Sequence, residues 1–152
     1  MPRMTKAFSI AELIIIVAII GILAALAVPH LRSHATEAKE TAAKDNLRVL
    51  RDAISFYAVH HGDVAPGYEG DDPDVEPTAT CFIRQMVDEA NYLRKIPANP
   101  FNDLDTVRII KDDDPFPTRG TGDHGWIYQP ATGTIRVDWP GKDLKGVAYI
   151  EY

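Results

Sequence analysis

The densest group of side chains that could do chemistry is acidic and lies in the second half of the chain. Asp112, Asp113 and Asp114 form a run next to two prolines, and Asp123 with His124 follows a few residues later. Calcium requires about six to eight oxygen ligands from a shaped loop, and carboxylates commonly supply them. The proline-flanked run predicts a solvated acidic loop. A calcium site built from Asp112, Asp113, Asp114 and Asp123 is the alternative, and we assign no metal site.

Other reactive residue types occur without the neighbours that catalysis requires. His60 and His61 are adjacent, so they do not share a helix face, and they are better placed to compensate the dipole at a helix end than to bind one metal. Cys81 precedes Phe82 and Ile83, which indicates a small buried residue rather than a nucleophile. The sequence has no Gly-rich phosphate loop, serine elbow or paired-carboxylate motif. It therefore predicts a protein that is not an enzyme and needs no cofactor.

The composition fits a folded domain with an appended apolar segment. Of the 152 residues, 45% are hydrophobic and 25% are charged. Residues 13–28 carry no charged or polar side chain. The net charge of −6 leaves no basic stripe that could neutralise phosphates, which excludes a sequence-blind nucleic-acid binder. A single cysteine excludes an intramolecular disulfide.

The apolar segment could be a retained membrane anchor or an ordinary secretory signal. Residues 8–28, taken as a helix, reach about 31 Å and match a hydrocarbon core about 30 Å thick. This stretch encloses Glu12, whose carboxylate costs about 2.5–3.5 kcal/mol in lipid and calls for a partner. Residues 25–27 resemble a signal-peptidase site. Glu12 and the helical pattern that continues beyond residue 28 favour a retained anchor.

The N-terminal residues resemble the processing signal of type IV pilins and type II secretion pseudopilins. Residues 6–13 read Lys-Ala-Phe-Ser-Ile-Ala-Glu-Leu and precede the apolar run. The resemblance implies that a prepilin peptidase cleaves between Ala7 and Phe8 and methylates the new N-terminal amine of Phe8. The family usually has glycine before the cut, and Ala7 is another small residue. The resemblance also implies that Glu12 neutralises the N-terminal ammonium of a neighbouring subunit.

A second helical segment is predicted to continue from the apolar one. Between residues 32 and 61, apolar residues recur at spacings of three and four. The stripe that they form consists of Ala43, Leu47, Leu50, Ile54 and Tyr57. Gly62 is a suitable stop. Pro29 lies inside the combined helix and predicts a bend, and the family resemblance implies that the stretch from Gly21 to Pro29 can extend during assembly.

The remaining residues predict a small mixed head of helix and strand. Residues 63–79 are rich in Gly, Pro and Asp and indicate an irregular surface loop, and residues 80–90 predict a short helix with Thr78 or Thr80 as its N-cap. Strands are expected at residues 106–110, 125–129 and 134–138. The last two flank a turn-like Pro-Ala-Thr-Gly sequence and predict an antiparallel hairpin. Its expected buried face consists of Trp126, Tyr128, Ile135 and Val137. Residues 147–152 are expected to form a further strand or a docked tail.

Together these elements predict an α+β fold that is type IV pilin-like. A long N-terminal α-helix, with a transmembrane half and an amphipathic half, is expected to pack against a small antiparallel β-sheet head. The expected segments are a cytoplasmic leader (1–7), a transmembrane and assembly helix (8–29), the amphipathic half of the long helix (30–62) and a periplasmic head (63–152).

A second segment makes the resemblance to this family more specific. Residues 92–102 are similar to the stretch of the type II major pseudopilin that introduces its sheet, with Asn99 and Phe101 where that family more often has Asp and Trp. The resemblance implies a structural subunit that polymerises through its N-terminal helix into a periplasmic filament, which pushes secreted proteins through an outer-membrane channel. Arg3 and Lys6 predict a single-pass inner-membrane protein with its leader in the cytoplasm and its head in the periplasm.

The implied partners are further copies of the chain, minor pseudopilins, the inner-membrane assembly platform with its ATPase, the prepilin peptidase and, before assembly, membrane lipid. Nucleic acid is not among them. A major or minor subunit of a type IV pilus is the nearest alternative, because the processing signal is shared. A secreted or membrane-tethered binding module with an ordinary signal peptide is the alternative from another class. An anchored enzyme is a third alternative, and only the acidic residues at 112–124 favour it.

Overall fold

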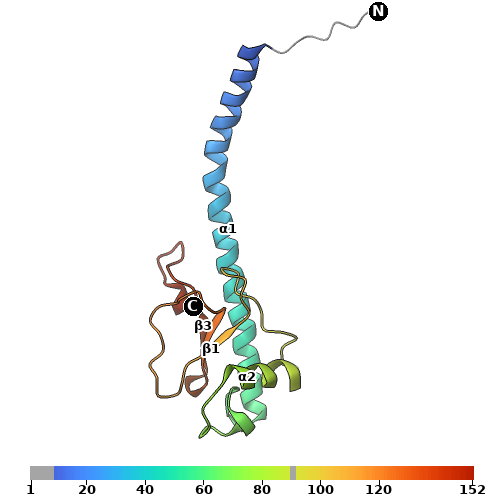
Figure 1. Cartoon of the computed structure of the whole chain (residues 1–152), viewed down its shortest axis with the longest axis vertical. Coiled ribbons are helices and arrows are strands. Elements are labelled where there is room, and N and C mark those ends of the chain that lie inside the picture. Colours follow the sequence, from blue (N-terminus) through green and yellow to red (C-terminus); the bar gives the residue numbers. More distant parts are fainter. Residues whose placement is uncertain (1–8, 90–91) are drawn as a thin grey trace, which may run out of the picture. The chain divides into compact units, whose positions relative to one another are not determined.

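The computed structural model describes residues 9–89 and 92–152, apart from the side chains of residue 24 and of residues 26–33. The chain divides into two compact units, Met1–Ala38 and Lys39–Tyr152. One helix, α1 (Ile10–His60), contributes to both units (Figure 1). The prediction of one long N-terminal helix is therefore confirmed.

Helix α1 begins and ends near the predicted residues. The side chain of Ser9 accepts a hydrogen bond from the backbone N–H of Ala11 over 3.3 Å at the N-terminal end. At the C-terminal end, Gly62 has a φ of 67°, a left-handed conformation that glycine adopts readily. The α-helix is continuous through Gly21 and Pro29. The extension of that stretch on assembly stays a prediction.

The core of the second unit lies between α1 and a small sheet. All five residues of the predicted helical stripe are buried. Trp126, Tyr128, Ile135 and Val137 are buried in the same cluster, with exposed fractions of 0–1%. The prediction that the hairpin packs its alternating side chains against the helix stripe is therefore confirmed.

The sheet is mixed, and the prediction of an antiparallel sheet was wrong for one of its two pairs. Strand β2 (Trp126–Gln129) pairs antiparallel with β3 (Thr134–Val137), as expected for the hairpin. Strand β1 (Val107–Ile109) pairs parallel with β2, in the register Val107 to Trp126. After residues 110–125, the chain enters β2 in the same direction as β1.

The remaining elements surround this core. Helix α2 (Ala79–Ile83) is capped by Thr78, whose Oγ1 accepts from the N–H of Cys81 over 3.1 Å, as predicted. It continues as a π-helical segment (Arg84–Glu89), where an α-helix had been expected. The loop that precedes α2 contains a short 3₁₀ helix (Glu69–Asp71), and the residues after β2 form another (Pro130–Thr132). The C-terminal residues form a third (Tyr149–Glu151) and are a docked tail rather than a strand.

Candidate functional site

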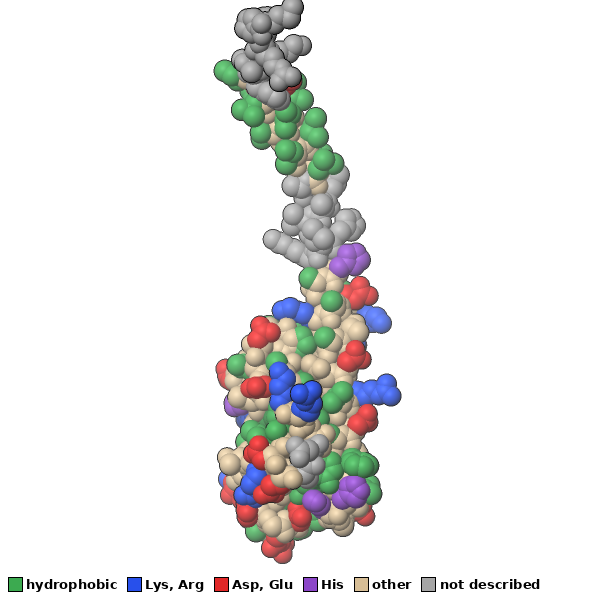
Figure 2. Space-filling model, turned by 90° about the vertical axis from the view of Figure 1, so that its right-hand side faces the viewer, with side chains coloured by type: hydrophobic (Ala, Val, Ile, Leu, Met, Phe, Trp, Pro, Cys, Tyr) green, Lys and Arg blue, Asp and Glu red, His purple; other side chains and the backbone are tan. Residues whose placement is uncertain are grey.

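The N-terminal part of α1 is the candidate assembly segment. Every residue from Ser9 to Leu23 is exposed. Its exposed large hydrophobic side chains are those of Ile10, Leu13, Ile14, Ile15, Ile16, Val17, Ile19, Ile20, Ile22 and Leu23. Successive helical residues point about 100° apart, so this segment is apolar on all sides, and Figure 2 shows hydrophobic side chains gathered on it. A helix that is hydrophobic all round is typical of one that becomes buried in a larger assembly or a membrane.

Within the described residues, no helical stretch combines the length and the apolar character that a membrane crossing requires.

Glu12 is the one charged residue of the candidate assembly segment. It lies in the first turn of α1, three residues after the capping Ser9, which is the spacing of a capping box. A carboxylate in this position interacts favourably with the positive end of the helix dipole, by about 0.3–1 kcal/mol. The local geometry therefore accounts for an acidic residue at the start of the helix. It leaves the carboxylate exposed, so Glu12 can also meet a cation from another molecule.

The predicted processing site lies outside the described residues, since Ala7 and Phe8 both precede Ser9. The side chain of Pro29 lies outside them as well. At Gly21 an added Cβ would meet nothing within 4 Å, so no contact among the described residues requires glycine there. Cleavage, methylation and the segment boundaries derived from the family resemblance stay predictions.

The acidic candidates for a calcium site are not brought together. The hydroxyl of Tyr68 donates to both carboxylate oxygens of Asp112 over 2.9 Å, and Asp113 and Asp114 lie exposed beside it. Asp123 is exposed in another turn, where its backbone N–H donates to the side chain of Thr121. Among residues 9–89 and 92–152, no three His, Cys, Asp or Glu side chains form a group that could hold a metal ion.

The two adjacent histidines contact neighbouring side chains, and the cysteine is buried. Nδ1 of His60 lies 3.3 Å from the hydroxyl of Tyr92, and Nδ1 of His61 lies 3.6 Å from the carboxylate of Asp71. Cys81 is 2% exposed, which confirms the prediction of a small buried residue. Burial raises the pKa of its thiol above the ordinary value, which disfavours the nucleophilic thiolate.

Three buried carboxylates were not predicted from the sequence, those of Glu40, Asp138 and Asp143. Asp138 is fully buried and accepts hydrogen bonds from the backbone N–H groups of Thr121, Gly122 and His124, and so organises the turn before β2. Glu40 is 8% exposed and accepts from the N–H of Leu144. A signal for Glu40 was available, because it stands three residues before Ala43 and therefore continues the apolar stripe. None was available for Asp138, whose donors lie 14 to 17 residues away.

The fold and the assembly segment define an α+β protein of the pilin-like class: a long N-terminal helix, exposed and apolar in its first part, whose second part packs on a small sheet. The chain is 30% identical over 100 residues to the type II secretion system core protein G of Pseudomonas aeruginosa, which covers 65% of this chain and 70% of that protein. It belongs to this family.

Other relatives agree with that assignment. The core protein G of Escherichia coli K12 is 26% identical over 101 residues, covering 63% of this chain and 66% of that protein. The type IV major pilin protein PilA of Myxococcus xanthus is 46% identical over 58 residues, which are 38% of this chain and 26% of that pilin. The chain thus spans about two thirds of the core proteins G that it matches. No protein-family model matches the chain, and no solved structure matches it.

Proposed function

We propose that this chain is a structural subunit of a type II secretion pseudopilus, which polymerises through the N-terminal part of α1. The observation that carries the proposal is the exposed segment from Ser9 to Leu23, apolar on all sides and containing a single carboxylate. The second unit, residues 39–152, is called the head from here on; it has its own buried core, which contains no residue of this segment. Family membership indicates the same system, because two of the three relatives named above are core proteins G of type II secretion.

The apolar side chains and the carboxylate of the segment have different effects on the contact between subunits. Burying one Ile or Leu side chain contributes about 1.5–3 kcal/mol, and a carboxylate in apolar surroundings costs about 2.5–3.5 kcal/mol. Two of the ten large apolar side chains therefore offset Glu12. The apolar surface supplies the affinity between subunits, whereas Glu12 selects the one axial position in which its carboxylate meets a cation.

Processing supplies that cation. Cleavage between Ala7 and Phe8 removes residues 1–7 and creates a new ammonium group at Phe8, which the peptidase methylates. This amine of one subunit pairs with the Glu12 carboxylate of its neighbour. Before assembly, the segment 8–29 lies in the inner membrane with the head in the periplasm. Residues of this segment, including Gly21 and Pro29, then form the core of the filament.

The filament performs mechanical work. The inner-membrane platform and its ATPase add copies at the base, minor pseudopilins are further partners, and the growing rod pushes secreted proteins through the outer-membrane channel. No bond is made or broken in the cargo, so the subunit needs no catalytic residue. We propose no cofactor.

Mass spectrometry of the mature N-terminus tests the processing step. The proposal requires a chain that starts at N-methylated Phe8. A chain that starts near residue 28 would instead identify a secreted module with an ordinary signal peptide, and it would overturn the assembly role of the segment.

Substitution of Glu12 tests the register. Glu12→Gln should leave the protein in the membrane fraction and lower the yield of sheared filaments at least about tenfold, because the cation of the neighbour loses its partner. Ser9→Ala is the matched control, since it removes the helix cap and keeps the carboxylate. If Ser9→Ala lowers filament yield as much as Glu12→Gln does, Glu12 acts through the helix end and not through a neighbour.

A subunit of a type IV pilus is the second candidate. The observation that favours it is the 46% identity with PilA over 58 residues, which exceeds the identity with any core protein G named above. That similarity covers only 26% of the pilin, whereas the similarity to the P. aeruginosa core protein G covers 70% of the core protein. In a strain that lacks its own major pseudopilin, a pseudopilus subunit should restore secretion rather than form surface pili. This experiment separates the two candidate functions.

A further inference from the structure

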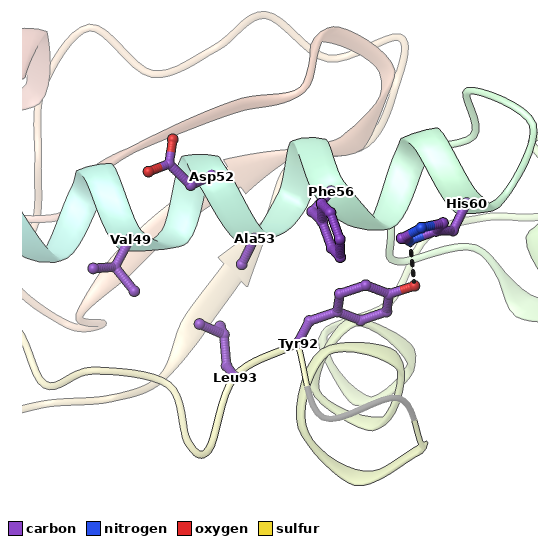
Figure 3. Close-up of a pocket in the computed structure, with 7 residues that line it drawn as sticks. All are labelled: Val49, Asp52, Ala53, Phe56, His60, Tyr92 and Leu93. Carbon is purple, nitrogen blue, oxygen red and sulfur yellow. Dashed lines mark hydrogen bonds between the residues drawn. The ribbon is translucent and has the colours of Figure 1, made fainter.

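One flank of α1 in the head carries an open apolar groove. We call it the α1 groove; it measures about 660 Å³ and is lined by Val49, Asp52, Ala53, Phe56, His60, Tyr92 and Leu93 (Figure 3). Val49 and Phe56 are 51% and 59% exposed, so large apolar groups face solvent here. In Figure 3 the side chains of Ala53 and Phe56 on α1 face those of Tyr92 and Leu93 across the groove.

The walls of the α1 groove are held in place by ring contacts. The ring of Phe56 lies 4.5 Å from that of His60 and 5.9 Å from that of Tyr92, both in edge-to-face geometry. The hydroxyl of Tyr92 also contacts Nδ1 of His60. Preformed apolar walls need little ordering when they are covered, which favours binding of a partner.

A second exposed surface of the head has complementary chemistry. In the loop of residues 142–147, which we call the lysine loop, Leu144 is 61% exposed and Val147 is 40% exposed, and Lys142 and Lys145 are exposed beside them. The loop is rigidly held from within, because the side chain of Asp143 accepts from the N–H groups of Lys145 and Val147 over 2.8 Å. It thus presents two apolar side chains flanked by positive charge.

The charges of the two surfaces match. The Asp52 side chain at the wall of the α1 groove is 75% exposed, and its contact with Arg48 is long, at 3.9 Å. Such an exposed pair contributes little, so the carboxylate is easily shared with a second cation. A lysine loop whose apolar tips enter the groove would bring Lys142 or Lys145 towards this acid.

The two surfaces lie on opposite flanks of the same helix and at different heights. The lysine loop is attached to α1 at Glu40 through the N–H of Leu144. Ala53, in the middle of the α1 groove, is thirteen residues further along, which corresponds to about 20 Å of rise and about 140° of rotation. The loop therefore cannot reach the groove of its own chain, and a contact between two copies is head-to-tail. A heterologous contact of this kind generates an open helical filament when the rotation between successive copies does not close into a ring.

We infer that the α1 groove of one subunit receives the lysine loop of a second copy of this chain, with Leu144 and Val147 against Phe56 and Val49 and with a lysine near Asp52. This inference rests on the proposed function, because it assigns a contact between heads within the filament. The N-terminal helices supply most of the affinity, and the contact between the heads sets how far each copy is displaced and rotated relative to the next.

Disulfide cross-linking of filaments in the cells that assemble them tests the contact. The full chain carries Phe56→Cys together with Leu144→Cys, while Cys81 stays in place because it is buried. Oxidation should give a ladder of covalent dimers, trimers and longer oligomers. The control pairs Leu144→Cys with Val75→Cys, at another exposed apolar position of the head, and should give at most a trace of dimer.

Charge reversal gives a second readout. Asp52→Lys and the double change Lys142→Glu with Lys145→Glu should each lower filament yield about tenfold, which corresponds to about 1.4 kcal/mol. All three changes combined should restore the yield. Asp74→Lys, an equal reversal at an exposed site outside both surfaces, should leave it unchanged.

The outcomes separate this inference from the proposed function. Filaments that form normally but give no ladder beyond the control overturn the groove contact and leave the proposed function standing. An unsubstituted chain that forms no filaments although it is processed and inserted overturns both.

Discussion

The backbone N–H of Leu144 donates to Oε1 of Glu40 over 3.1 Å, and so joins the C-terminal residues to the first buried turn of α1 in the head. The hydroxyl of Tyr149 donates to the same oxygen over 3.3 Å. A carboxylate that is 8% exposed is tolerated only where such donors compensate its lost hydration. Glu40 therefore helps to fix the position of the C-terminal segment on the helix, together with Arg51, which donates to the backbone oxygen of Tyr152.

Replacing Glu40 should loosen that segment. Glu40→Ala leaves the N–H of Leu144 and the hydroxyl of Tyr149 without their acceptor, and we expect it to lower the free energy of unfolding by about 2–3 kcal/mol. Glu40→Gln keeps an acceptor oxygen and should cost less than about 1 kcal/mol. Urea unfolding of the detergent-solubilised full chain, followed by tryptophan fluorescence, measures both. Equal losses in the two variants would contradict this role of the side-chain oxygen.

Asp143 should make the stability of the same segment depend on pH. Burial raises the pKa of its carboxyl, but hydrogen bonds from the hydroxyl of Tyr152 and from the N–H groups of Val147 and Lys145 outweigh this effect and hold the pKa below its ordinary value of 3.8. A carboxyl whose pKa is lowered by folding contributes stability that is fully present well above pH 3.8 and is lost as the pH falls through the lower, folded-state pKa.

The comparison with Asp143→Asn measures this contribution. At neutral pH the wild-type chain should be more stable than the variant, and the difference should shrink as the pH falls below about 4, because protonation removes the same charge. A difference that stays constant from pH 7 to pH 2 would show that the carboxylate charge is not what holds the tail.

The helix stripe and the hairpin could be predicted from the sequence because their signals are local. Apolar spacings of three and four identify the face that carries Leu47 and Ile54, and the alternation on either side of residues 130–133 identifies the hairpin. Gly133, with a φ of 61°, closes that turn as its position indicates.

The pairing of β1 with β2 could not be predicted in the same way. The direction of β1 depends on the path of residues 110–125, which form no helix and whose turns do not reveal where the chain rejoins the sheet. The acidic run at residues 112–114 suggested a shared site with Asp123, but that path leads Asp112 to Tyr68 and brings the turn around Asp123 to Asp138. Contacts between residues so far apart in the sequence leave no periodic pattern from which they could be predicted.

Asp138 should be the most sensitive polar residue of the head. It is fully buried and accepts hydrogen bonds from three backbone N–H groups. Among the described hydrogen bonds, no other side chain accepts from these three groups. Hydrogen bonds to a charged acceptor contribute about 1.5–3 kcal/mol each, so Asp138→Ala should cost at least about 3 kcal/mol. Asp138→Asn keeps one oxygen acceptor and should cost less. Thermal unfolding ranks the two variants, and an alanine variant as stable as wild type would contradict the assignment.

Gly125 should be intolerant of any side chain, because the chain enters β2 in close contact with the residues before β1. A Cβ at this position would lie 2.2 Å from the backbone carbonyl oxygen of Leu104, far inside contact distance. Backbone cannot move aside as a flexible side chain can, so Gly125→Ala should displace β1 from β2 and cost about 3 kcal/mol or more. Gly21→Ala is the matched control, since its Cβ meets nothing within 4 Å and alanine favours a helix by about 0.5–1 kcal/mol. The midpoint of thermal unfolding of the head should therefore fall in Gly125→Ala and stay unchanged in Gly21→Ala, which lies outside residues 39–152. A Gly125→Ala head as stable as wild type would mean that β1 does not approach β2 in the parallel arrangement described here.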